Sequence, residues 1–176
     1  MAEKKLFLTW LLFASLISVG IIIGIQFDVF SFVYTNDASK LSIAIFAVFI
    51  IMTLYCGNLA WRLSCLKEKV EHAEFNPAYY QTYKKIEIGI LHVEEAINNS
   101  VLAGFLGTVL GVMLMIYAIK TMGTVQIASL ADVWEIAKWA FTASITTAVG
   151  IISAILLSIQ RHLLRIALWE KKNGQG

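Results

Sequence analysis

The sequence has 176 residues, of which 59% are hydrophobic and 15% are charged, and its formal net charge at pH 7 is +2. Soluble domains carry about 25% charged residues, so this composition excludes an ordinary soluble domain and favours an integral membrane protein. The small net charge gives no argument for a nucleic-acid partner. The two cysteines, Cys56 and Cys65, lack metal-type spacing and do not predict a disulfide framework.

Four apolar stretches follow one another along the chain, and each is close to the ~20 residues that a helix needs to cross a bilayer. None of them contains Asp, Glu, Lys, Arg or His. Because the backbone in lipid must satisfy its own hydrogen bonds, we expect all of them to be helices. The first stretch is longer than the apolar part of a signal peptide and has no small-residue cleavage site after it, which predicts a retained span. The stretches are residues 6–27, 41–61, 101–119 and 139–160.

The connections between these spans differ in length. Residues 28–40 form a short polar loop, whereas residues 62–100 form the longest connection. Asn76-Pro77 predicts a helix start, and the apolar residues after it recur at helical spacing toward the third span. We therefore expect a helical hairpin over residues 62–100, protruding ~20 Å at 1.5 Å per residue. Ser129 and Asp132 predict a second helix start before the fourth span.

Basic residues set the expected orientation. If the N-terminus is cytoplasmic, eleven of the 14 Lys and Arg residues lie inside and only Lys40, Lys120 and Lys138 lie outside. The excess of inside charge predicts that both termini and the hairpin are cytoplasmic. Arg161, Arg165, Lys171 and Lys172 form a basic C-terminal segment that we expect to meet anionic lipid head groups. Trp10, Trp61, Trp139 and Trp169 lie near span ends, as interface anchors do.

The last two spans differ from the bulky first two by their faces of small residues. Such faces let helices approach closely in lipid, so packing alone is one reading of them. The other is that they surround a further helix, with the hydroxyls of Thr108 and Thr147 assisting an ion. Because no span contains a charged side chain, the chain alone is an incomplete channel. The faces comprise Gly104, Gly107 and Gly111 on the third span and Ala143, Thr147, Gly150, Ala154 and Ser158 on the fourth.

Two segments carry a family resemblance. Residues 104–113, Gly-Phe-Leu-Gly-Thr-Val-Leu-Gly-Val-Met, and residues 146–151, Thr-Thr-Ala-Val-Gly-Ile, resemble the Gly-Thr segments of the last two spans in the MotA/TolQ/ExbB proton-channel family. The likeness covers roughly residues 100–159, and the four-span layout is like the MotA branch. Val101 and Leu156 stand where members often have proline. The hairpin is smaller than the torque-generating domain of flagellar MotA, which argues against a flagellar role.

The resemblance implies an assembly and a function. Members form homopentamers around a dimer of a single-span ExbD/TolR/MotB-like partner, whose aspartate carries the ion, in the bacterial inner membrane. Thr108 and Thr147 match the two channel threonines of the family. Gly104, Gly107, Gly111, Ala143, Gly150 and Ala154 would pack the pore ring. Ion flow, of protons or sodium, would then drive mechanical work.

The expected fold is therefore an all-α integral membrane protein with four transmembrane helices and a cytoplasmic helical hairpin between spans two and three. Its parts are an outer transmembrane hairpin (residues 1–61), the cytoplasmic hairpin (62–100), an inner pore-ring hairpin (101–160) and a basic cytoplasmic tail (161–176). No nucleophile–base pair, metal cluster or cofactor-binding loop is visible, so we expect neither an enzyme nor a cofactor. The alternative to a channel is a non-conducting oligomeric membrane scaffold.

Overall fold

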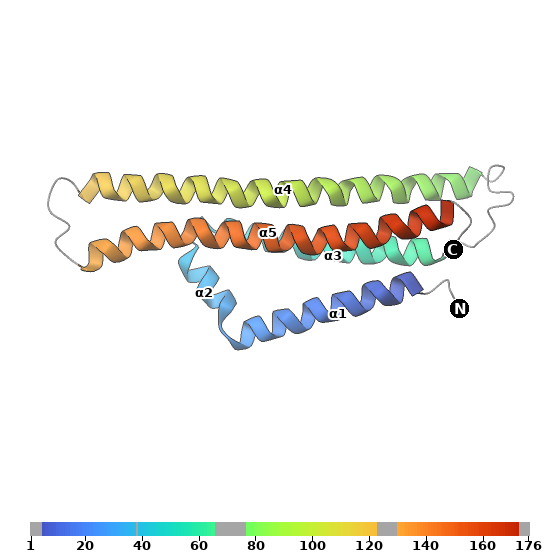
Figure 1. The fold of residues 1–176 in the computed structure, drawn as a ribbon, viewed down its shortest axis with the longest axis horizontal. Coiled ribbons are helices and arrows are strands. Elements are labelled where there is room, and N and C mark those ends of the chain that lie inside the picture. Colours follow the sequence, from blue (N-terminus) through green and yellow to red (C-terminus); the bar gives the residue numbers. More distant parts are fainter. Residues whose placement is uncertain (1–4, 38, 66–76, 123–129, 173–176) are drawn as a thin grey trace. The chain divides into compact units, whose positions relative to one another are not determined.

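The computed structural model describes residues 5–37, 39–65, 77–122 and 130–172. These residues are almost entirely α-helical and form α1 (Lys5–Gln26), α2 (Val29–Asn36), α3 (Leu41–Cys65), α4 (Pro77–Met122) and α5 (Leu130–Lys172), shown in Figure 1. Four of these helices, α1, α3, α4 and α5, contain a segment long and apolar enough to cross a membrane. Each of the four predicted stretches therefore lies in a helix that is long and apolar enough to be a span.

The two longest helices extend well beyond their apolar stretches. α4 begins at Pro77, as predicted, and continues for 46 residues without a break. α5 has 43 residues and continues through the basic segment to Lys172, so that segment and the fourth span are one helix (Figure 1). Residues 66–76, which hold the turn of the predicted hairpin and Asn76, lie outside the described residues, as does Ser129. The hairpin therefore stays a prediction.

The connection between the first two spans is not the polar loop that we expected. It contains α2, an eight-residue helix with the sequence Val-Phe-Ser-Phe-Val-Tyr-Thr-Asn. The loop prediction was wrong because it gave weight to the flanking residues Asp28, Asp37 and Lys40, whereas five of the eight residues between Asp28 and Asp37 are apolar or aromatic. Asp28 begins the turn into α2 with a left-handed backbone, φ 53°. Two phenylalanines of this additional helix, Phe30 and Phe32, pack against the rings of Phe46 and Phe141.

The chain divides into two compact units, and α1, α3, α4 and α5 each contribute to both. The first unit comprises Met1–Ile21, Phe49–Ile97 and Ile155–Gly176, and the second comprises Ile22–Val48 and Asn98–Ala154. α1 has no buried side chain. α3 has a buried face, although we expected the second span to belong to an outer hairpin of bulky residues. The core of the first unit consists of Cys56, Leu59, Ala60 and Leu63 from α3, Ile86, Ile90 and Val93 from α4, and Leu164 and Leu168 from α5.

A tryptophan attaches α1 within the first unit. The ring of Trp10 lies directly over Gly57 of α3, where an added Cβ would come within 2.4 Å of it. The Trp10 indole N–H donates to Oε1 of Gln160 on α5 at 3.2 Å, and Nε2 of Gln160 donates to the Thr53 hydroxyl on α3 at 3.2 Å. Gln160 is fully buried. Trp10, which we expected at the membrane interface, thus joins three helices through a buried amide.

Replacing this amide tests the attachment of α1. We expect Gln160→Leu to lower the stability of the protein by about 1 kcal/mol, because interhelical hydrogen bonds in membranes average about 0.6 kcal/mol each and two are lost. Thermal unfolding in detergent, followed by tryptophan fluorescence, measures the effect. The same change at exposed Gln26, at the end of α1, is the control. Equal melting temperatures for the two variants would show that the buried amide does not hold α1.

An ion pair joins α4 and α5 in the same unit. Nη1 of Arg161 lies 2.9 Å from the Glu94 carboxylate, and both side chains are partly exposed. An exposed pair of this kind contributes about 0–1 kcal/mol. Arg161, which we expected to contact lipid head groups, therefore has a protein partner.

Candidate ion-pathway site

In the second unit, α4 and α5 approach each other through their small residues. A Cβ at Gly107 would lie 2.3 Å from the Thr146 methyl group, and one at Gly111 would lie 2.7 Å from the Ala143 Cβ. A Cβ at Gly150 would lie 2.7 Å from the Ser100 carbonyl oxygen. The backbones themselves are therefore in contact, which is possible only because these positions have no side chain.

The six residues that we expected to pack the ring fall on or beside this contact. Gly104, Gly107 and Gly111 of α4 face Ala143, Thr146, Thr147 and Gly150 of α5. Ala143 and Ala154 are both buried. The small residues thus pack α4 against α5 within one chain.

The hydroxyls of Thr108 and Thr147 are in direct contact between α4 and α5. The Thr147 hydroxyl also lies 3.0 Å from the Ala143 carbonyl oxygen and 3.3 Å from that of Gly104. The Thr108 hydroxyl reaches the same two carbonyls, at 3.4 and 3.2 Å. Each hydroxyl has a single proton to donate, so the pair leaves oxygen lone pairs available to a cation or a water. The structure thus brings together the two threonines that the sequence singled out.

Two further threonines on α5 are fully buried, and our sequence reading did not single them out. Thr146 donates its hydroxyl to the Thr142 carbonyl at 2.9 Å, one turn away, and its methyl group covers Gly107. The Thr142 hydroxyl donates to the Asn36 carbonyl at 2.6 Å, at the end of α2. Beside it, the rings of Phe32 and Phe141 pack edge to face, 5.7 Å apart. The repeat of threonine at i and i+4 was the available signal for this second, internal hydroxyl row.

A buried carboxylate organises the start of α3, next to α2. The Ser42 backbone N–H donates to Oδ2 of Asp37 at 2.9 Å, while the Ser39 N–H and hydroxyl donate to Oδ1 at 3.0 and 2.6 Å. Burial by itself would raise the pKa of Asp37, but the hydrogen bonds from Ser39 and Ser42 outweigh it and hold the pKa below its usual value. Asp37 therefore acts as a structural cap in its ionised form.

The lowered pKa makes stability depend on pH in a defined direction. Ionised Asp37 stabilises the fold fully above its unfolded pKa of about 3.9, and this contribution is lost as pH falls through the lower folded pKa. We therefore expect Asp37→Asn to lower the melting temperature in detergent at pH 6, with the difference from the unmodified protein shrinking as pH falls below the unfolded pKa of about 3.9.

Asp28→Asn is the matched control, because the Asp28 side chain forms no capping hydrogen bond to α2. It should leave the melting temperature unchanged across this range. A difference between the Asp37→Asn variant and the unmodified protein that does not shrink as pH falls through and below about 3.9 would contradict the assignment of Asp37 as an ionised cap.

Comparison with known proteins identifies the family. The model of the MotA/TolQ/ExbB proton channel family matches residues 66–170, more than half of the chain. No curated protein and no solved structure matches the chain. Members of this family are multi-pass bacterial inner-membrane proteins that serve as channel subunits of ion-driven motor and transport systems, associate with ExbD/TolR/MotB-type partners, and are not enzymes. The match includes both threonine segments, and the chain therefore belongs to the MotA/TolQ/ExbB proton channel family.

Proposed function

We propose that the chain is the ring-forming subunit of an inner-membrane channel that couples proton or sodium flow to mechanical work. Five copies would surround a dimer of a single-span partner, whose aspartate carries the ion between the Thr108 and Thr147 pairs of successive subunits. Both termini and the segment 62–100, as a helical hairpin, would lie in the cytoplasm. Residues 1–61 would form the outer layer, 101–160 the inner ring and 161–176 the basic tail.

The observation that carries this proposal is the hydroxyl pair itself. Thr108 and Thr147 are in contact and half-buried, and they lie in spans that contain no charged side chain. Hydroxyl and carbonyl oxygens stabilise a passing cation or hold a water, but they do not carry a proton as a carboxylate does. A site with such oxygens and no carboxylate fits one half of a channel whose ion-carrying group belongs to another chain.

A flux assay tests the proposal. The partner is expected to be a small protein, encoded by a neighbouring gene, with one N-terminal span that carries an aspartate. Vesicles that contain both proteins should take up protons or sodium, whereas vesicles with the chain alone or with the partner's aspartate changed to asparagine should not. Equal flux with and without the partner would contradict a half-channel.

One observation favours the alternative of a non-conducting scaffold. Thr146 and Ala143 of the same chain already occupy the spaces above Gly107 and Gly111, so helix packing alone accounts for these glycines. If the protein is a non-conducting scaffold, no combination of partner and ion gradient should give flux above that of empty vesicles. The oligomer should still form. The same assay therefore separates the two functions.

A further inference from the structure

One face of α4 carries an apolar stripe that ends in a tyrosine and a lysine. Leu106, Leu110, Met113, Tyr117 and Lys120 follow one another at intervals of four, three, four and three residues, which places them on the same side of the helix. All five side chains are exposed. This stripe lies away from Gly104, Gly107 and Gly111, which face α5. It therefore belongs to the outer surface of the second unit.

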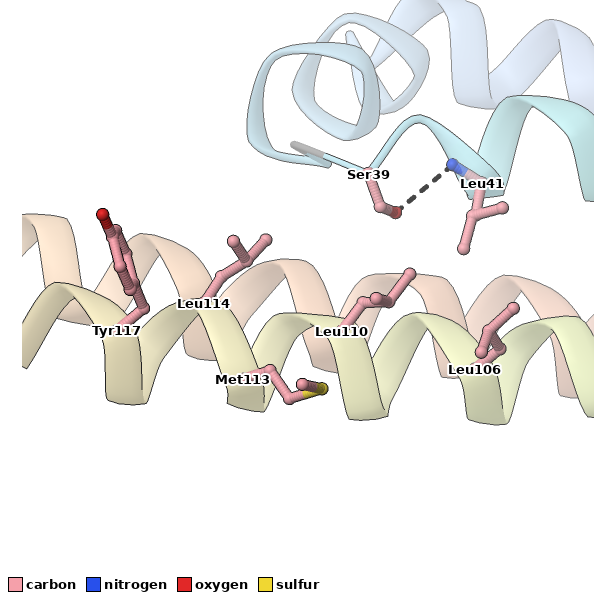
Figure 2. A pocket seen from close by; sticks show the side chains of 7 residues that line it. All are labelled: Ser39, Leu41, Leu106, Leu110, Met113, Leu114 and Tyr117. Atoms are coloured by element: carbon pink, nitrogen blue, oxygen red, sulfur yellow. Dashed lines mark hydrogen bonds between the residues drawn. The ribbon is translucent and has the colours of Figure 1, made fainter.

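The stripe forms one wall of an open groove in the second unit. The groove has a volume of about 480 Å³, and Ser39 and Leu41 at the start of α3 form the opposite wall, as Figure 2 shows. Its lining is almost entirely apolar. The Ser39 hydroxyl is already used, since it donates to Asp37 and accepts from the Leu41 N–H. A ligand in this groove is therefore held by hydrocarbon contact over most of its length.

The dimensions of the groove match one leaflet of a bilayer. From Leu106 to Tyr117 the helix rises ~16 Å at 1.5 Å per residue, and half of a typical hydrocarbon core is ~15 Å. A helix of this length and 10 Å diameter would occupy roughly 1,300 Å³. The groove encloses less than half of that volume, which favours a thinner ligand such as an acyl chain.

The chemistry at the end of the groove favours an anionic head group. Tyr117 and Lys120 lie where the apolar stretch of α4 ends, and tyrosine and lysine at this depth face lipid head groups. Lys40, between the lining residues Ser39 and Leu41, is exposed but does not line the groove, since its amine lies over the Tyr34 ring at 4.0 Å and donates to the Tyr34 carbonyl. The nearby Asp37 carboxylate is buried and engaged by Ser39 and Ser42, so it does not offer a free anion to these lysines.

We propose that this groove is a binding site for one anionic phospholipid. An acyl chain lies along Leu106, Leu110 and Leu114 against Leu41, and the phosphate lies at Lys120 beside Tyr117. The lipid fills the space between the start of α3 and α4, so its binding stabilises the second unit. The lipid site does not require ion conduction. It would therefore also exist if the protein were a non-conducting scaffold.

Native mass spectrometry of the full-length protein in detergent tests the site, with phosphatidylglycerol and phosphatidylcholine of identical acyl chains as probes. We expect retention of phosphatidylglycerol over phosphatidylcholine. Leu110→Trp, which fills the groove, should abolish retention of both lipids. Lys120→Gln should weaken phosphatidylglycerol binding about fivefold, the effect of one lysine near an anionic head group, and leave phosphatidylcholine binding unchanged.

Lys84→Gln, the same change at an exposed lysine in the first unit, is the matched control and should have no effect. Equal loss of phosphatidylglycerol in the Lys84→Gln and Lys120→Gln variants would overturn the site in favour of a general attraction of lysines for anionic lipid. Unchanged lipid retention in the Leu110→Trp variant would also overturn it. A changed subunit number in that variant, with lipid retention intact, would assign the groove to an interface between copies.

Discussion

Thr147→Val is expected to abolish ion flux through the complex while leaving the fold and the oligomer intact. Valine keeps the shape of threonine but removes the hydroxyl, which contacts the Thr108 hydroxyl and lies within 3.3 Å of the Gly104 and Ala143 carbonyls. The loss should be at least ~100-fold, because a cation that passes an apolar surface forfeits several kcal/mol of oxygen contact. Flux into vesicles that contain the chain and its partner measures this effect.

Thr146→Val is the matched control for this experiment. Thr146 is the preceding residue and also a threonine, but its hydroxyl is buried and donates only to the Thr142 carbonyl one turn away among the contacts described. The Thr146→Val variant should therefore retain most of the ion flux. Thr147→Ser, which restores the hydroxyl, should recover conduction. Normal flux in Thr147→Val would remove Thr147 from the ion pathway, and equal loss in both valine variants would attribute the effect to packing.

Gly150→Ala is expected to destabilise the contact between α4 and α5 by about 1–3 kcal/mol, the usual cost of overpacking a well-packed interface. The added methyl group would lie 2.7 Å from the Ser100 carbonyl oxygen and 3.0 Å from the Gly104 Cα. Both are backbone atoms, so the helices must move apart to make room. Thermal unfolding of the purified protein measures the loss, and flux should fall with it because the Thr108–Thr147 contact widens.

Gly20→Ala provides the control, since no atom lies within 4 Å of a Cβ built at Gly20. Both substitutions gain the same helix propensity, about 1 kcal/mol, so any difference between them reports packing. Gly20→Ala should be neutral or stabilising. If the two variants unfold at the same temperature, the close approach of the two helices at Gly150 does not exist.

Much of this architecture follows from patterns that the sequence displays openly. Four uncharged stretches predict four helical spans because a backbone in lipid must satisfy its own hydrogen bonds. The structure has four helices of the required length and hydrophobicity. Pro77 marks the start of α4 because its ring suits the first helical turn. The glycines at 104, 107 and 111 predict a close helix contact, and they face α5. Periodicity and composition were sufficient for these features because the signal for each lies within one segment of the sequence.

The features that the sequence did not reveal depend on pairs of distant residues. The Trp10–Gln160–Thr53 contact joins three helices, and no spacing rule links positions so far apart along the chain. α2 was missed because short helices are stabilised mainly by their tertiary contacts, here Thr142 with Asn36 and Phe32 with Phe141. The buried position of Thr146, next to Thr147, was also not predicted. Which of two adjacent hydroxyls is buried depends on the rotation of α5 about its axis, and packing against other helices sets that rotation.

The central claim is that α4 and α5 of several copies form a ring around a helix from another chain. A single-particle image of the complex, purified with its partner from the membrane, tests this most directly. We expect five copies of the chain around two partner helices, with the partner's aspartate at the level of Thr108 and Thr147. A ring whose centre holds only lipid or this chain's own side chains would contradict the half-channel. It would instead support the non-conducting scaffold.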